Sequence, residues 1–458
     1  MMALLLIALT GHLAFWFWRS RPGILIRLAK DSAQLVDGMV QPGDDDAKLE
    51  ALETRTAQVL ISFVLFLFWV AVGMAIMVSL PWGWDIAMNR QDGLAAFSSW
   101  QGLLAISAGG TLGLLYPKGK PSSSSYSSMN QLVHHLMLDH FHLQRWLHNK
   151  EVKGWRKKGG IPEPKFLLVT GLARAGTTSL LQRLMETDAF SSLHYGHMPL
   201  VVAPGTWSRW NKPKETALKE RSHGDGILVG ADSAEALEEP FWRLRNEAGY
   251  VQEDVLEPHR VSAEDHAAYL DFQGLVRENG KVYLAKNNNA LLRYPALRSH
   301  NKDFRVVLMF REPLAHAASL LAMHQRYTAM QSEDPFVKTY MDWLAHHEFG
   351  LGHKPFRFDA GTSRTSGSTS DPDTLEYWLE RWMDYYEHAL TADAHGVLFV
   401  SHEMWSRRPS EVLAAVLDEV GVVGAPLNLE PHMRKRKAED TVEAAQLQRV
   451  EALYSRLM

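Results

Sequence analysis

Residues Leu167 to Met185 read LLVTGLARAGTTSLLQRLM. An apolar run ends at Gly171, and a pattern with helical spacing follows Gly176. The stretch therefore predicts a buried strand, a glycine loop and a helix that begins near Thr177. The loop has the spacing G-x-x-x-x-G-T-T, with Thr177 at the position where a triphosphate-binding loop has its lysine.

The predicted loop keeps the features of an anion site without that lysine. Its glycines allow backbone amides to turn inward as a nest, and the positive end of the following helix adds its field. These features suit one phosphate group better than Mg-ATP, and a glycine turn without a ligand is the alternative. The candidate ligand residues are Arg174, which is the cation of the loop, Ala175, Gly176, Thr177, Thr178 and Ser179.

A second candidate anion site lies in the stretch VVLMFREPLAHAASLL, residues 306–321. Arg311 and Pro313 follow an apolar run, and proline is well tolerated in the first turn of a helix. Ser319 comes eight positions after Arg311, about two helical turns further on. A guanidinium group and a hydroxyl group placed in this way can both bind one phosphate. The alternative is a strand-end arginine in a surface salt bridge.

Four short apolar runs, each followed by a helical stretch, predict the fold class. Runs of this length suit strands that are buried on both faces, and their alternation with helices predicts an α/β fold with a central parallel sheet flanked by helices. The runs are KFLLVTG from Lys165, KVYLAKN from Lys281, FRVVLMFREP from Phe304 and GVLFVSH from Gly396.

The two anion motifs together resemble those of the sulfotransferase superfamily, enzymes that use 3′-phosphoadenosine 5′-phosphosulfate (PAPS). The segment Ala173–Thr178 resembles the family motif that binds the 5′-phosphosulfate. Arg311, Pro313 and Ser319 resemble the motif that binds the 3′-phosphate. The resemblance implies a P-loop-like sulfotransferase domain over residues 161–458, with PAPS as co-substrate and no metal. It covers roughly residues 165–422 and is patchy between the motifs.

Sulfuryl transfer needs a cation at the leaving group and a base for the acceptor hydroxyl. The resemblance implies the cation role for Lys286, although Asn287–Asn289 depart from the family continuation. An exposed strand-end lysine is the alternative. We predict Glu239 as the base, with Glu238 beside it, because nearby apolar rings raise a carboxyl pKa; a solvated helix face is the alternative. His197 is the rival base, with a near-neutral pKa, and a structural histidine is equally consistent with the sequence.

Metal and nucleic-acid sites have little support in the sequence. The chain has 458 residues, a net charge of −4 and no cysteine. It therefore has no thiolate ligands, and no other metal-ligand spacing is present. Its overall charge gives no indication of nucleic-acid binding. The basic cluster at residues 433–440 fits a solvated charge run better than a nucleotide-binding loop, because it lacks glycine.

Three apolar segments predict a membrane-anchoring region over residues 1–117, with helices at about 2–18, 58–82 and 94–116. Arginine and lysine residues follow the first and third segments, so three crossings place the later domain in the cytoplasm. Two crossings would place it outside. Residues 118–160 are predicted as a linker and a basic juxtamembrane region, which is either a solvated face or a contact with anionic lipid headgroups.

These features lead to one expected function and two alternatives. We expect a multi-pass membrane sulfotransferase that modifies a hydroxyl group of a carbohydrate, a glycolipid or another lipid-linked acceptor. A membrane-bound kinase or ATPase would share the loop spacing, although the missing lysine opposes it. A non-catalytic membrane scaffold could keep the fold without the chemistry. The sequence leaves the oligomeric state open.

Overall fold

The structure is a computed structural model that divides into two compact units, Met1–His142 and Leu143–Met458. It describes residues 2–40, 45–89, 95–115, 128–210, 219–220, 228–229, 233–246, 249–358, 371–391, 396–425, 427, 429–431 and 443–458. The predicted linker at 118–127 and the basic cluster at 433–440 lie outside these residues, as does most of a segment, residues 359–374, whose polar sequence predicts a loop.

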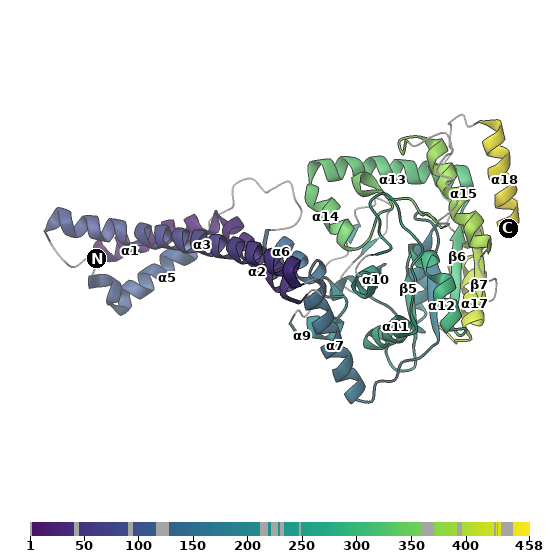
Figure 1. The fold of residues 1–458 in the computed structure, drawn as a ribbon, viewed down its shortest axis with the longest axis horizontal. Helices are drawn as coiled ribbons and strands as arrows, with labels where there is room; N and C mark the ends of the chain where they lie inside the picture. Colours follow the sequence, from purple (N-terminus) through teal and green to yellow (C-terminus); the bar gives the residue numbers. More distant parts are fainter. Residues whose placement is uncertain are drawn as a thin grey trace. The chain divides into compact units, whose positions relative to one another are not determined.

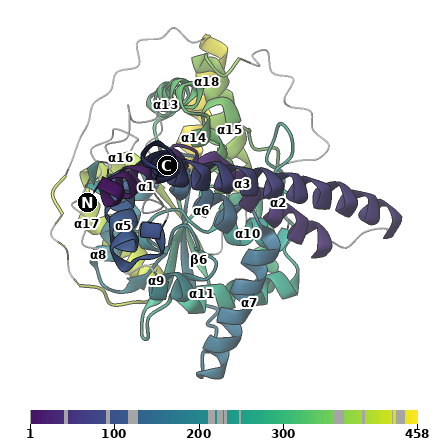
Figure 2. The same ribbon diagram turned by 90° about the vertical axis from the view of Figure 1, so that its left-hand side faces the viewer.

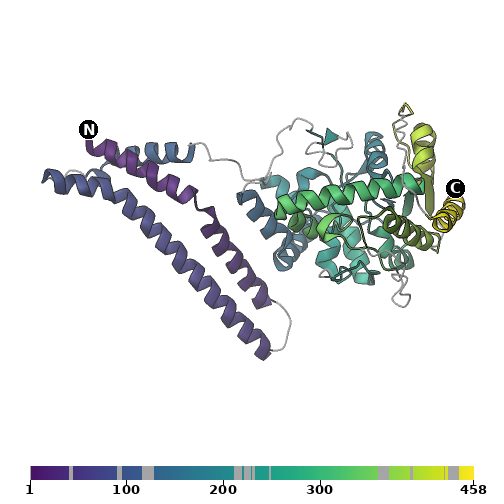
Figure 3. The same cartoon turned by 90° about the horizontal axis from the view of Figure 1, so that it is seen from above.

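The first unit is helical throughout its described part. In Figure 3 the long helix α3 runs beside α1 and α2. The backbones of α1 and α5 approach closely, since a Cβ atom on Gly109 would lie 1.9 Å from the carbonyl oxygen of Ala8. Small residues therefore permit this packing. The elements are α1 (Met2–Arg19), α2 (Pro22–Val40), α3 (Asp45–Met88), η1 (Ala96–Ser98), α5 (Trp100–Leu115) and α6 (Ser128–Leu138).

One described helix, Leu52–Met88, is long and apolar enough to cross a membrane, with a mean hydropathy of 2.7 and 11% of its most apolar window buried. It contains the predicted second span. The helices over Ala3–Trp18 and Gly23–Val36 pass the same test only as one pair, bent by 48°. The described part of the predicted third span forms η1 and the helix α5, and the described residues there contain no helix that meets the length and hydropathy test. Length and composition thus support one crossing, or two with the bent pair, and the predicted three are not supported.

The second unit is built on a five-stranded sheet in the order β2-β5-β1-β6-β7, and its recorded pairings are parallel (Figure 1). Four of its strands are those predicted from the apolar runs: β1 (Phe166–Thr170), β5 (Val282–Lys286), β6 (Arg305–Phe310) and β7 (Val397–Ser401). The predicted α/β class with a parallel sheet is confirmed. The edge strand β2 (Phe190–Ser191) was not predicted, because two residues carry no periodic signal.

Helices cover both faces of this sheet (Figure 2). On one face, Leu180 and Leu184 of α8 and Val416 of α17 join Leu167 and Val169 of β1 in the core. On the other face, the ring of Tyr269 in α11 lies 5.5 Å from that of Phe166. The helices of this unit are α7 (Phe141–Lys157), α8 (Thr177–Glu186), α9 (Pro204–Trp210), α10 (Glu239–Asn246), α11 (Ala263–Val276), α12 (Tyr294–His300), α13 (Pro313–Glu333), α14 (Pro335–Trp343), α15 (Leu375–Thr391), α16 (His402–Arg407), α17 (Pro409–Val420) and α18 (Ala444–Leu457).

Short elements complete the second unit. They are the 3₁₀ turns η2 (Tyr195–His197), η3 (Ala290–Leu292) and η4 (Gly350–Gly352), and an antiparallel pair of β3 (Lys219–Glu220) and β4 (Leu228–Val229).

The basic segment before the sheet belongs to the second unit. Leu147 and His148 of α7 are buried, and the His148 ring lies 5.7 Å from that of Phe241. Lys150, Lys153 and Lys157 are exposed, so α7 has an inner packed face and an outer basic face. The units accordingly divide at residues 142 and 143, whereas the predicted boundaries were at 117 and 160.

Candidate functional site

The predicted phosphate loop, Lys286 and Arg311 lie at the carboxyl-terminal edge of the parallel sheet. The phosphate loop follows β1, Lys286 ends β5 and Arg311 follows β6, and His402, which was not predicted as a site residue, follows β7. These strand ends are adjacent, since Val169 is in register with Lys286 and Phe310 with Ser401. In open parallel sheets this edge is where ligands bind.

The phosphate loop has the conformation that its glycines permit. Gly171 has a φ of +148°, and a Cβ atom there would lie 2.4 Å from the carbonyl oxygen of Met309. Gly176 has a φ of +100° and is followed directly by helix α8, which begins at Thr177 as predicted. The backbone of Arg174 adopts the left-handed conformation, with a φ of +72°. This conformation is rare for residues other than glycine and is concentrated at functional sites.

The two predicted anion motifs meet in space. The Nε–H group of Arg174 donates a hydrogen bond to Oγ of Ser319 at 3.3 Å. Ser319 lies on α13, which begins at Pro313 as predicted, and Glu312 caps this helix through the amides of Leu314 and Ala315. A cation of the first motif and a hydroxyl of the second therefore face the same small volume.

A buried histidine that the sequence reading missed supports the phosphate loop. Nε2 of His316 lies 2.8 Å from the carbonyl oxygen of Ala173. Burial, helped by the charges of Arg311, His402 and Arg174, lowers the pKa of His316 to about 3, although the hydrogen bond to Ala173 opposes the shift. The ring is therefore neutral, and Nε2 carries the proton that it donates to the loop. The only sequence signal was its position one turn after Pro313.

Helix α16 packs against the same loop from β7. A Cβ atom on Gly176 would lie 2.8 Å from Cδ2 of His402, so the imidazole ring covers this glycine. The indole N–H of Trp405 donates to Oγ of Ser179 at 3.2 Å. The amide of Ala175 donates to the carbonyl of Leu172 at 3.1 Å and is therefore already engaged. The ligand roles predicted for Ala175 and Ser179 stay predictions.

Thr177 and Thr178 occupy the first turn of α8, where amide groups have no partner within the helix. Both side chains are largely buried, and so is Ala175. The positive end of a ten-residue helix and a left-handed arginine thus surround one loop. This arrangement suits an anionic group.

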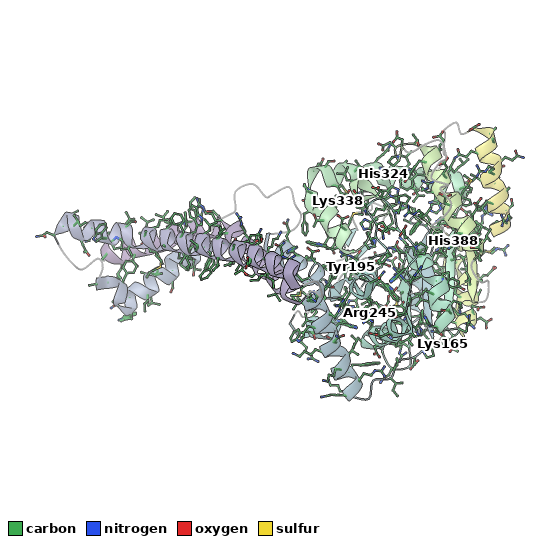
Figure 4. The ribbon with its side chains drawn as sticks, viewed as in Figure 1. Lys165, Tyr195, Arg245, His324, Lys338 and His388 are labelled. Atoms are coloured by element: carbon green, nitrogen blue, oxygen red, sulfur yellow. The ribbon has the colours of Figure 1, made fainter. Side chains whose placement is uncertain are left out.

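Lys286 is a buried strand-end cation in a small polar network. Its Nζ lies 3.0 Å from Oε1 of Glu235. The hydroxyl group of Tyr195, labelled in Figure 4, donates to Oε2 of the same carboxylate at 3.1 Å. The alternative that Lys286 is an exposed strand-end lysine is therefore wrong, because its side chain is buried.

The two candidate base carboxylates are buried among partners from the protein itself. Glu239 is 3% exposed and receives two hydrogen bonds from Arg293, at 2.6 and 3.1 Å, and one from Tyr250. Burial alone would raise its pKa, but the charge and hydrogen bonds of Arg293 outweigh burial and hold the pKa below its ordinary value. The rise in pKa expected at Glu239 is therefore wrong.

Glu238 shows the expected rise, since burial holds its pKa above the ordinary value against bonds from Tyr269, Tyr283 and Asn287. The alternative of a solvated helix face is excluded for both carboxylates, because each is almost fully buried. Their partners favour a structural role, and a base role for either stays a prediction.

The side chain of His197 forms a hydrogen bond within its own 3₁₀ turn. Its Nδ1 accepts a hydrogen bond from the amide of His194 at 3.2 Å, and the two rings lie 3.6 Å apart. Burial, helped by the charge of His194, lowers the pKa of His197 to about 3. The near-neutral pKa expected for this residue is wrong, because its side chain is withdrawn from water. Its role as a base stays a prediction.

Within the described part of the chain, no group of three or more histidine, aspartate or glutamate side chains is arranged to hold a metal ion.

Known proteins resemble this chain only weakly. No family model matches the sequence, and no curated protein matches it. Among solved structures, the sulfotransferase STF1 from Mycobacterium tuberculosis H37Rv is similar, at 15% identity and a TM-score of 0.37, over 74% of this chain and 93% of that one. STF9 from Mycobacterium avium is similar at 12% identity and a TM-score of 0.40, over 79% of this chain and 90% of that one.

A sulfotransferase from Alicyclobacillus acidocaldarius is similar at 14% identity and a TM-score of 0.27, over 64% of this chain and 91% of that one. Likenesses with such low TM-scores carry no functional argument, which rests on the residues of this chain.

Proposed function

We propose that this chain transfers a sulfuryl group from PAPS to the hydroxyl group of an acceptor, and that it works at a membrane. The observation that carries the proposal is the 3.3 Å contact between Arg174 and Ser319. It joins a loop suited to one anionic group with a helix that begins beside Arg311. A ligand with two separate anionic groups fits such a pair of motifs better than a chain of linked phosphates does.

Each group has a role in this proposal. The amino-terminal end of α8 and Arg174 bind the 5′-phosphosulfate, and Arg311 with Ser319 binds the 3′-phosphate. Lys286, at the end of the adjacent strand, stabilises charge near the transferring group. The apolar helix Leu52–Met88 is the reason for proposing that the chain works at a membrane. We accordingly propose that the acceptor is a carbohydrate, a glycolipid or another lipid-linked molecule.

Calorimetry on the detergent-solubilised full chain tests the proposal. We expect adenosine 3′,5′-bisphosphate (PAP) to bind tightly and without dependence on Mg²⁺, and AMP and ATP to bind much more weakly. The physical reason is that the loop lacks the lysine that the β and γ phosphates need. A preference for ATP with Mg²⁺ would instead support a kinase or ATPase.

Replacing Arg311 with alanine is expected to weaken PAP binding by about 10- to 100-fold and to leave AMP binding nearly unchanged. A charge-assisted hydrogen bond contributes about 1.5–3 kcal/mol to binding. AMP has no 3′-phosphate, so its binding does not include this bond and should not change. Isothermal titration with both nucleotides measures the difference. Arg305→Ala is the matched control, since Arg305 begins the same strand and pairs with Glu419 at 2.9 Å. Equal losses for PAP and AMP would remove the assignment of Arg311 to the 3′-phosphate.

A further inference from the structure

We propose that His346, oriented by Glu348 and Asn288, takes the proton from the acceptor hydroxyl, and that this hydroxyl enters on an alcohol with an apolar body. The inference rests on the proposed function and adds to it the base and the class of acceptor.

The first observation is an oriented imidazole. Nδ1 of His346 lies 3.3 Å from Oε1 of Glu348, and the amide of the Asn288 side chain donates to the same oxygen at 2.9 Å. Nε2 of His346 has no hydrogen-bond partner within the described part of the chain, and 24% of the side chain is exposed. A ring with one nitrogen fixed by a carboxylate and the other open is the arrangement of a general base.

The second observation is that this pair is tied to the end of strand β5. Asn287–Asn289 directly follow Lys286, and two of their side chains bond to the segment 345–348. Asn288 donates to Glu348, and Asn289 donates to the carbonyl oxygen of Ala345 at 3.2 Å. The residues that depart from the family continuation after Lys286 thus hold the 345–348 segment at the strand end that carries the catalytic cation of the proposed function.

The charges that face His346 come from more than one element. Glu348 lies on its own segment, Lys286 on β5, and Glu235 before α10. Burial alone would lower the pKa of His346, but the Glu348 charge outweighs burial and holds the pKa above its ordinary value. Burial alone would raise the pKa of Glu348, but His346 and the bond from Asn288 lower it to about 2. Glu348 is therefore the charged orienting group, and His346 is the stronger base.

The third observation is a cleft that reaches from the phosphate loop to Glu348, the carboxylate partner of His346. It is lined by Leu172 and Ala173 of the loop and by the apolar side chains of Leu320, Phe356 and Trp378; its polar lining residues are His347, Glu348, His353, Lys354, Arg381 and Asp384. Most of the surface that these walls expose is apolar, and hydroxyl groups buried without partners cost free energy, so the cleft favours an apolar alcohol over a carbohydrate. The loop and Glu348 lie at the same cleft, so a hydroxyl group there can meet the donor.

Proton transfer to His346 accompanies the transfer of the sulfuryl group in this proposal. The O–H bond of the alcohol breaks and its proton moves to Nε2 of His346, while the alcohol oxygen forms a bond to sulfur. The bond between sulfur and the bridging oxygen breaks, and its electron pair leaves on the 5′-phosphate of the nucleotide. Arg174 and the amino-terminal end of α8 lie at the loop that would receive this charge. The imidazolium formed on His346 is stabilised by the Glu348 carboxylate.

The test follows PAP release from PAPS by the detergent-solubilised full chain, with 2-naphthol as the apolar alcohol and methyl glucoside as the polar one. We expect 2-naphthol, and not methyl glucoside, to accelerate release. His346→Gln should lower the accelerated rate by about 100-fold with unchanged PAP affinity, as expected for loss of a general base. His300→Gln is the control, since His300 lies at the end of α12, bonds to the carbonyl oxygen of Val261 and does not line the cleft.

Glu348→Gln provides a second readout that a purely structural role would not move. The rate should rise with pH through the pKa of His346, because only the neutral ring accepts a proton. Removing the carboxylate charge lowers that pKa, so the acid limb of the kcat profile should shift to lower pH as the maximum falls. The inference is overturned if His346→Gln keeps wild-type turnover, or if the acid limb of Glu348→Gln stays at the wild-type pH. The proposed function still stands in either case if the protein binds PAP. Loss of PAP binding in the wild type overturns the proposed function itself.

Discussion

Replacing Glu239 with glutamine is expected to lower the free energy of unfolding by about 3–5 kcal/mol, the cost of breaking one side of a buried ion pair. Glu239 and Arg293 are 3% and 1% exposed, and two hydrogen bonds join them. The variant leaves the Arg293 charge buried and only partly compensated. Thermal and denaturant unfolding, followed by tryptophan fluorescence of the full chain, measure the loss.

Two comparisons separate this structural role from a catalytic one. Glu264→Gln removes an exposed partner of Arg245 and should cost less than about 1 kcal/mol. The stabilisation by Glu239 should be present above its unfolded pKa and lost as the pH falls through its lower folded pKa, because Arg293 favours the charged form. If Glu239→Gln keeps wild-type stability and PAP affinity but loses turnover, the residue is the base that the sequence predicted.

Replacing Arg174 with glycine is expected to weaken PAP binding by about 10- to 100-fold. The guanidinium group is the cation of the phosphate loop and bonds to Ser319, so its loss removes charge-assisted donors at both anion motifs. Glycine accepts the φ of +72° without the Cβ strain that arginine and alanine share, so the loop conformation stays accessible in the variant. A loss of PAP affinity then reports on the missing guanidinium group and not on a loop that cannot adopt its backbone conformation.

The matched control is Arg183→Ala on the exposed side of the same helix α8. Arg183 pairs with Glu186, and both side chains are almost half exposed. Its removal should leave PAP affinity unchanged and should cost little stability. Isothermal titration of both variants gives the comparison. PAP affinity that stays at the wild-type value in Arg174→Gly would place the 5′-group elsewhere and remove the loop from the proposed site.

Much of the architecture could be predicted because its determinants are local. Four strands followed from apolar runs, and the start of α8 followed from the glycine spacing. Pro313 marked the start of α13, since its fixed φ suits a first turn. Apolar composition alone does not predict where a helix begins. A helix was predicted from residue 94, whereas α5 begins at Trp100.

The sequence alone determined four strands of the sheet, the glycine loop and the choice of candidate anion ligands, because apolar runs and glycine act on neighbouring residues. The tertiary structure decided what each polar side chain does. Arg174 and Ser319 are 145 positions apart, and Glu239 and Arg293 are 54 apart. A carboxylate near aromatic residues reads as a base until its partner is known. The pKa and the role of such a carboxylate depend on which charged side chain the fold places beside it in the buried interior. That partner is distant in the sequence, so no local pattern predicts it.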